Sequence, residues 1–111
     1  MRETARRAIV ILRTTHASFI RVEKYSIDND LHSRQFADIA VAELVLAQSI
    51  VRECPSTVGV EGQIVVLGLA LQHIIENINR VEIESDRAEL LQRGMVLMSG
   101  VIGTIIRDLH T

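Results

Sequence analysis

Cysteine, proline and aromatic residues are scarce in this chain of 111 residues, and tryptophan is absent. The one cysteine, Cys54, has no partner for an internal disulfide, which fits a reducing compartment. The one proline, Pro55, is expected to end a helix just before it. Aromatic residues make up only 3% of the chain, so any core must be built from Ile, Leu, Val, Met and Ala.

A strong charge of one sign is also lacking. The formal net charge is −2, which argues against nucleic-acid binding through a wide basic field. A local exception is the start of the chain, where Arg2, Arg6, Arg7 and Arg13 make a basic end. We interpret these arginines as the solvated face of a helix.

Long hydrophobic runs are missing as well. The longest apolar stretches, 64–71 and 95–106, fall short of the ~20 residues that a membrane-spanning helix needs. The apolar run 8–12 behind the charged start is too short for a secretory signal. We therefore expect one cytoplasmic domain covering 1–111, with no membrane span.

What the chain does have is helical periodicity. Apolar residues make up 48% and charged residues 23%, enough for a packed core. Apolar positions recur at helical spacing in four segments, roughly 3–25, 31–53, 58–81 and 87–109. The short links between them make sequential helices antiparallel neighbours. The sequence thus predicts an all-α fold, an antiparallel up-down-up-down four-helix bundle.

Capping residues agree with these boundaries. Asp30 can cap the second segment, and Ser56 or Thr57 can cap the third. Asp86 and Glu89 have the spacing of a capping box before the fourth. The residues expected on the inner faces are Ala5, Ala8, Ile9, Leu12, Phe19 and Val22 in the first segment; Phe36, Ile39, Ala40, Leu46, Ala47, Ile50 and Val51 in the second; Val60, Ile64, Leu67, Ala70, Leu71, Ile74, Ile75 and Ile78 in the third; and Leu91, Met95, Met98, Val101, Ile102, Ile105 and Leu109 in the fourth.

Charged and titratable residues interrupt three of these inner faces. They are His16 and Glu23 in the first segment, Glu43 in the second and Arg87 in the fourth. Buried charges are costly unless paired, so we expect His16 to meet Glu43 and Glu23 to meet Arg87. The favoured interpretation is two structural pairs that fix helix register. The alternative is a buried polar pocket around His16, Glu43 and Glu23 that binds a ligand or performs catalysis.

Metal and catalytic motifs are weak. A Glu-x-x-His pair, the signature of carboxylate-bridged metal bundles, occurs only in reverse order at His73 and Glu76, both expected to face outward. We therefore predict no metal and no cofactor. Cys54 has no nearby partner for a catalytic dyad, and we lean against an enzymatic activity.

The predicted architecture is similar to that of histidine phosphotransfer domains. Those domains share a solvent-exposed helical histidine followed by Lys and Gly. Here His16 is followed by Ala17 and Ser18, and the segment 72–77 around the exposed His73 has no such pattern. A phosphotransfer role is therefore the less favoured form of the catalytic alternative.

Extra apolar residues lie outside the predicted core. Val41 and Val45 in the second segment fall level with Leu69 and Val65 in the third, because the two segments are antiparallel. A cluster of exposed apolar residues indicates an interface. We expect an interaction or regulatory module that forms a homodimer or higher oligomer here, with a further protein partner as a possibility.

Small residues form a strip in the fourth segment. Ser99, Gly100 and Gly103 lie on one side of the predicted helix. Glycine inside a helix costs up to ~1 kcal/mol relative to alanine, so a close approach of another backbone is a reason to keep it. Packing within the bundle and contact with a partner explain this strip equally well.

Overall fold

Four helices account for nearly all of the described chain in the computed structural model. Residues 2–26, 30–53 and 58–110 are described, apart from the side chains of Arg2, Asp30, Val58 and Glu84. The helices are α1 (Arg2–Tyr25), α2 (Asp30–Arg52), α3 (Val58–Arg80) and α4 (Glu84–His110). No strand occurs in those residues. The predicted all-α four-helix bundle is confirmed.

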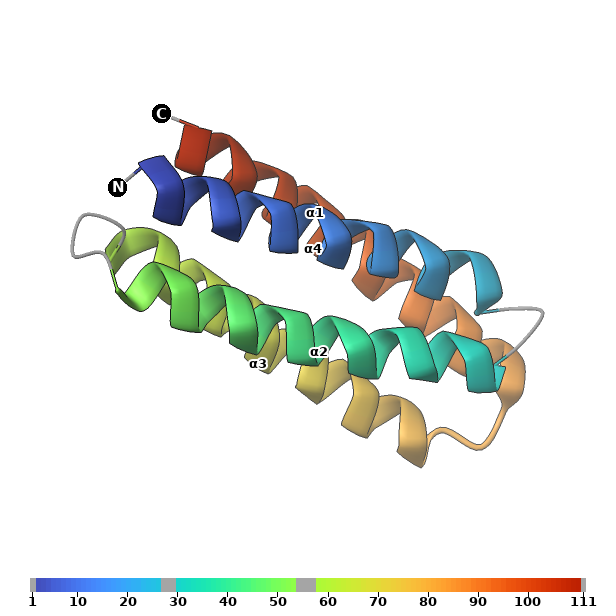
Figure 1. Cartoon of the computed structure of the whole chain (residues 1–111). Helices are drawn as coiled ribbons and strands as arrows, with labels where there is room; N and C mark the ends of the chain where they lie inside the picture. The colour runs from blue at the N-terminus through green and yellow to red at the C-terminus, as the bar shows by residue number, and fades with distance from the viewer. Residues whose placement is uncertain (1, 27–29, 54–57, 111) are drawn as a thin grey trace.

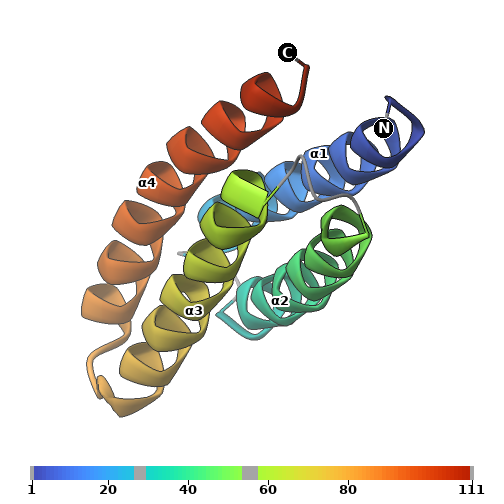
Figure 2. The same cartoon turned by 90° about the vertical axis from the view of Figure 1, so that its left-hand side faces the viewer.

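The helices run up and down in two layers. Figure 1 shows α1 and α4 side by side in one layer and α2 and α3 in the other, with the start and end of the chain at the same end of the bundle. Each helix packs against its neighbours around this ring, most extensively between α1 and α2 and least between α3 and α4. The rod measures 46 × 20 × 18 Å, and Figure 2 views it from its side.

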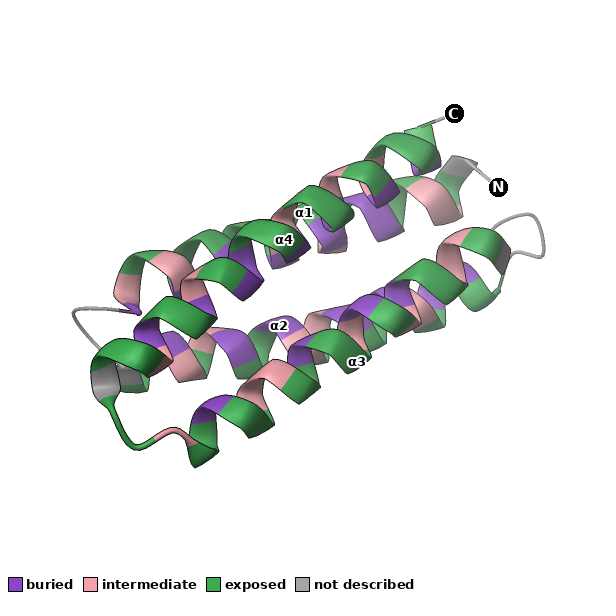
Figure 3. Cartoon of the chain, turned by 180° about the vertical axis from the view of Figure 1, so that it is seen from behind, coloured by how far each residue is buried: buried purple, intermediate pink, exposed green. Residues whose placement is uncertain are grey.

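The core follows a heptad repeat. In each helix a line of core positions recurs at alternating intervals of four and three residues, the spacing typical of bundles whose side chains interdigitate. Figure 3 shows the buried sides of the helices turned inward. Buried or partly buried at these positions are Ala8, Leu12, Thr15, Phe19, Val22 and Ser26 in α1; Ser33, Ala37, Ala40, Leu44, Ala47 and Val51 in α2; Val60, Ile64, Leu67, Leu71, Ile74 and Ile78 in α3; and Leu91, Met95, Met98, Ile102, Ile105 and Leu109 in α4.

Several predicted core residues are in fact exposed. Ile39 and Leu46 of α2 are 49% and 52% exposed, and Ala70 and Val101 are exposed as well. The small residues of the α2 heptad take the inner positions instead, because they let α2 pack closely on α1. Ile39 and Leu46 therefore face away from the core, although Leu44, Ile50 and Val51 of the same helix are buried.

Two fully buried hydroxyl groups, one in α1 and one in α2, donate to backbone carbonyls. The Ser33 hydroxyl, fully buried, donates to the carbonyl oxygen of Val22 at 2.9 Å. Thr15, also fully buried, donates to the carbonyl of Ile11 one turn earlier. Small hydroxyls thus occupy core positions without leaving unpaired groups, as buried polar atoms require.

The start of α4 differs from the prediction. The backbone N–H groups of Asp86 and Arg87 both donate to the carbonyl of Ile83, so the helix begins at Glu84 and Asp86 lies inside its first turn. The predicted capping box of Asp86 and Glu89 is therefore wrong. The predicted caps at Ser56 or Thr57, and the stop at Pro55, lie outside the described residues, as does the side chain of Asp30.

The side chain of Ile74 in α3 packs closely against one glycine of α4. A Cβ atom at Gly94, which is buried, would lie 2.8 Å from Cδ1 of Ile74. That distance is shorter than two carbon atoms tolerate, so a side chain at position 94 would require the end of the Ile74 side chain to move. Gly100 and Gly103 differ, because a Cβ atom there would meet nothing within 4 Å. Packing inside the bundle does not explain these two glycines.

Candidate functional site

Glu43 has a hydroxyl as its partner. Its Oε1 accepts a hydrogen bond of 2.9 Å from Oγ of Ser18, across the α1–α2 seam. His16 is half-buried and lies about 200° around α1 from Ser18, given 100° per residue. No hydrogen bond or ion pair joins His16 to Glu43, both of which are described, so the predicted pairing is wrong. A carboxylate and a hydroxyl in contact supply no nucleophile–base pair.

Glu23 and Arg87 also lie against residues other than the partners that the sequence predicts. The Nη1 of Arg87 donates to the carbonyl oxygens of Val81 at 2.9 Å and Glu82 at 3.1 Å. These two carbonyls lie in the non-helical connection 81–83 between α3 and α4. Arg87 therefore stabilises the α3–α4 connection, and the predicted Glu23–Arg87 pair is wrong. Both residues do lie at the end of the bundle where the prediction put them.

Glu23 instead borders a surface hollow. Together with Gln92, Arg93, Val96 and Leu97 of α4, it lines a space of about 480 Å³ on the α1–α4 side. The space is shallow and mostly apolar, with Leu97 72% exposed. The sites of His16, Glu23 and Glu43 are therefore separate, and a ligand role for each stays a prediction.

The four predicted interface residues do come together. Val41 and Val45 of α2 and Val65 and Leu69 of α3 line one groove of about 110 Å³ between these helices. Val45 is 56% exposed and Leu69 60% exposed. The floor is formed by Gly68, where a Cβ atom would just reach Cβ of Leu44 at 4.0 Å. The antiparallel register predicted for these residues is the one found.

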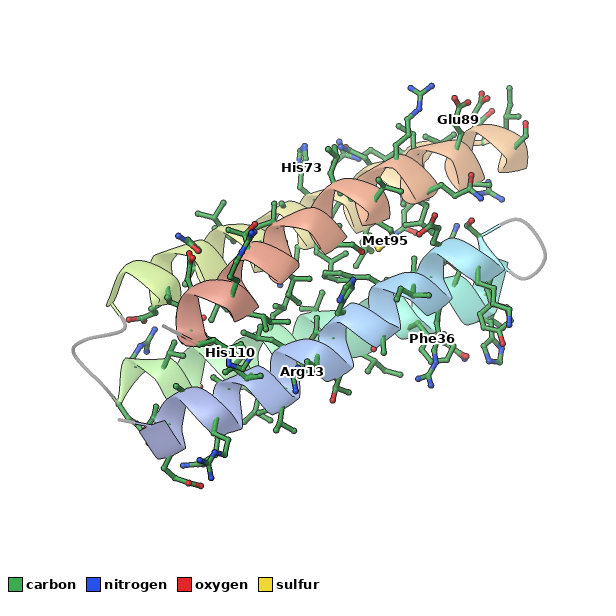
Figure 4. The ribbon with its side chains drawn as sticks, turned by 90° about the horizontal axis from the view of Figure 1, so that it is seen from above. Arg13, Phe36, His73, Glu89, Met95 and His110 are labelled. Atoms are coloured by element: carbon green, nitrogen blue, oxygen red, sulfur yellow. The ribbon has the colours of Figure 1, made fainter. Side chains whose placement is uncertain are left out.

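The groove lies in a part of the surface that is poor in charge. Residues 62–75 of α3 contain no Asp, Glu, Lys or Arg, and residues 39–51 of α2 contain only Glu43. Glu43 is bound to Ser18 of α1. His73 is exposed on α3, and Figure 4 shows it projecting away from the bundle. The cores of protein interfaces are depleted of charge in the same way.

Ring side chains gather at the first hairpin. Tyr25 and Phe36 are stacked, with ring centroids 5.9 Å apart and planes inclined by 8°. His32 packs against both rings, and the guanidinium of Arg21 lies 5.4 Å from the centroid of Phe36. Pattern analysis placed Phe36 in the core and missed this cluster. The rings join the end of α1 to the start of α2, which is a structural role.

The described residues contain no metal cluster and one helix with the length and composition of a membrane span. No group of three or more His, Cys, Asp or Glu side chains in that part of the chain could hold a metal ion. The segment Ser85–His110 is long and apolar enough to cross a membrane, with 33% of its most apolar window buried. This is a weak indication, since core helices of soluble proteins have the same properties.

Comparisons with protein-family models, with curated proteins and with solved structures find no match to this chain.

Proposed function

We propose that this chain is a small interaction module that self-associates through the outer face of α2 and α3. The observation that carries the proposal is the groove lined by Val41, Val45, Val65 and Leu69. Leu46 and Val66 add exposed apolar surface on the same two helices, at 52% and 66%. Apolar residues that cluster on the surface, as the four groove residues do, mark an interaction site more often than scattered ones do.

The outer face of α2 and α3 has the low charge and the area that an interface with a second copy of the chain needs. The face lacks exposed Asp, Glu, Lys or Arg along its middle, so it offers a partner neither ion pairs nor charge repulsion. Each helix has 23 residues, or about 34 Å at 1.5 Å per residue. Two adjacent helices of that length present an area comparable with the roughly 800 Å² that each partner contributes to a standard interface. A two-fold axis through the groove would bring apolar side chains onto their own copies.

The test is the molar mass in solution. One chain has a mass of 12.4 kDa. Light scattering after size exclusion, across a micromolar concentration series, should give about twice that mass or more for the unaltered chain. Leu69→Lys should return the mass to that of one chain, because a desolvated lysine in the groove is unpaired.

Leu97→Lys is the matched control. Leu97 is also a highly exposed leucine, but it lies on α4, away from the groove. It should keep the mass of the unaltered chain. A chain that is monomeric throughout the series, or an equal response to both substitutions, would refute self-association through α2 and α3.

A further inference from the structure

A hollow lies between α1 and α4 near the end of the bundle where the chain starts and ends. It is open to solvent and has a volume of about 440 Å³. Ala5, Ile9 and Leu109 supply apolar lining, and Ile9 and Leu109 are nearly buried at 7% and 8% exposure. Two guanidinium groups, those of Arg6 and Arg13, and an imidazole, that of His110, line it as well.

The positive groups converge on this hollow. Arg6 and Arg13 are seven residues apart, two turns of helix, and so lie on the same side of α1. The Nη2 of Arg13 lies 3.3 Å from Nε2 of His110, and Figure 4 shows the two labelled residues side by side. The last turn of α4 therefore brings its imidazole to the basic side of α1.

Among the described residues, no carboxylate lines this hollow to neutralise these charges. In the described part of the chain, Arg6 has no ion pair and Arg13 has only the contact with His110. Elsewhere the protein does pair exposed arginines, as with Arg52 and Glu61 at 2.9 Å. Two uncompensated guanidinium groups at one concave site attract an anion, and their planar donors match carboxylate and phosphate oxygens.

We propose that this hollow binds a small amphipathic organic anion. Its phosphate or carboxylate lies among Arg6, Arg13 and His110, and its apolar part lies against Ile9 and Leu109. A volume of about 440 Å³ falls within the range of small-molecule sites and exceeds what a bare inorganic ion fills. The site lies in the α1–α4 layer, so it goes beyond self-association through α2 and α3 and does not depend on it.

Calorimetric titration with octyl phosphate, below the concentration at which it forms micelles, tests the site. Octyl phosphate should bind more tightly than inorganic phosphate, and octyltrimethylammonium, a cation with the same chain, should not bind. Arg13→Gln should weaken octyl phosphate about tenfold or more, the usual effect of losing a charged hydrogen bond. Arg80→Gln removes an exposed arginine in the last turn of α3, outside this hollow, and should leave the affinity unchanged. Helical circular dichroism must be the same for both variants.

A second arm distinguishes a free ligand from a lipid headgroup. Vesicles of phosphatidylglycerol and of phosphatidylcholine are sedimented with the protein. Binding of octyl phosphate in solution that depends on Arg13 assigns the site to a free amphipathic anion. Binding only to phosphatidylglycerol vesicles, again dependent on Arg13, assigns it to an anionic lipid. Equal losses in Arg13→Gln and Arg80→Gln, equal binding of the cationic probe, or no binding in either arm would overturn the proposal.

Discussion

Three hydroxyl-bearing side chains of α1 and α2 are hydrogen-bonded to near neighbours. Ser33 donates to Val22 across the seam, Thr15 donates along its own helix, and Ser18 reaches the carboxylate of Glu43. Each group occupies a position where an unpaired donor or acceptor would cost about 1–3 kcal/mol. The stability of the bundle therefore depends in part on individual hydrogen bonds, and the loss of one should lower the free energy of unfolding measurably.

Ser18 provides the first such measurement. Ser18→Ala should lower the free energy of unfolding by about 1–2 kcal/mol, because the half-buried carboxylate of Glu43 loses its donor. Urea denaturation at neutral pH measures the change. Ser49→Ala is the control, because the Ser49 hydroxyl bonds only to Val45 of its own helix at an exposed position, and it should change stability little. Equal effects at both sites would mean that the Ser18–Glu43 contact does not stabilise the fold.

Arg87 allows a second measurement of what a single hydrogen-bonding side chain contributes to stability. Arg87→Leu should destabilise by about 1–3 kcal/mol, because the carbonyls of Val81 and Glu82 lose a charged donor. Glu23→Gln should be close to neutral, since Glu23 lines an open hollow and has no ion pair with Arg87. The two variants are compared in the same urea titration. A destabilisation by Glu23→Gln as large as that by Arg87→Leu would restore the pair that the sequence predicts.

The hydrogen-bond partners of Glu43 and Arg87 could not be predicted from the sequence. A helical wheel correctly predicts that Glu43 and Arg87 are partly buried. It does not show which side chains of α1 face Glu43, or that the carbonyls of Val81 and Glu82 lie within reach of Arg87. Ser18, the partner of Glu43, carries no charge and gives no signal in a search for ion pairs. The hollow that Arg6, Arg13 and His110 line was missed for a similar reason, since it joins residues about a hundred positions apart.

At the scale of the helix, the heptad repeat explains where core prediction succeeded and failed. In α4 the core positions carry large apolar residues, and all but Val101 of those predicted there are buried. In α2 four of the six core positions are Ser or Ala, while Ile39 and Leu46 are large and exposed. A prediction led by large apolar residues therefore included the exposed Ile39 and Leu46. The alternating spacing of four and three would have found Ala37 and Leu44, which were missed.

The glycines of α4 give a prediction at the same scale. Gly100→Ala should raise the free energy of unfolding of the single chain by up to about 1 kcal/mol, because alanine favours the helix and a Cβ atom meets nothing there. Gly94→Ala should gain less or lose, because Ile74 must move from a Cβ atom 2.8 Å away.

Thermal denaturation of the two variants at equal concentration makes the comparison. Adding Ile74→Val to Gly94→Ala should recover part of the difference, since it removes the atom that Gly94 accommodates. If Gly94→Ala is the more stabilising of the two, α3 and α4 do not pack closely at that glycine.

At the scale of the molecule, the fold was the most predictable property. Four periodic segments joined by short links leave few arrangements other than an antiparallel bundle. The wrong placement of Ile39 and Leu46 in the core of α2 does not change the number of helices or their order. The groove of Val41, Val45, Val65 and Leu69 was predictable for the same reason, because antiparallel register follows from the link between the helices. Its role as an interface stays a proposal.

The ring of helices has a consequence for connectivity. Because α1 packs on α4 as well as on α2, the order of the helices in space is cyclic, although their order along the chain is linear. A circular permutant that joins the end of α4 to the start of α1 by a short flexible linker, and opens the chain at 81–83, should keep the same helical content. It should lose stability mainly through the bonds of Arg87 to that connection. Circular dichroism and a urea titration would show this, and a permutant without helix would mean that the α3–α4 connection, rather than the packing, determines the topology.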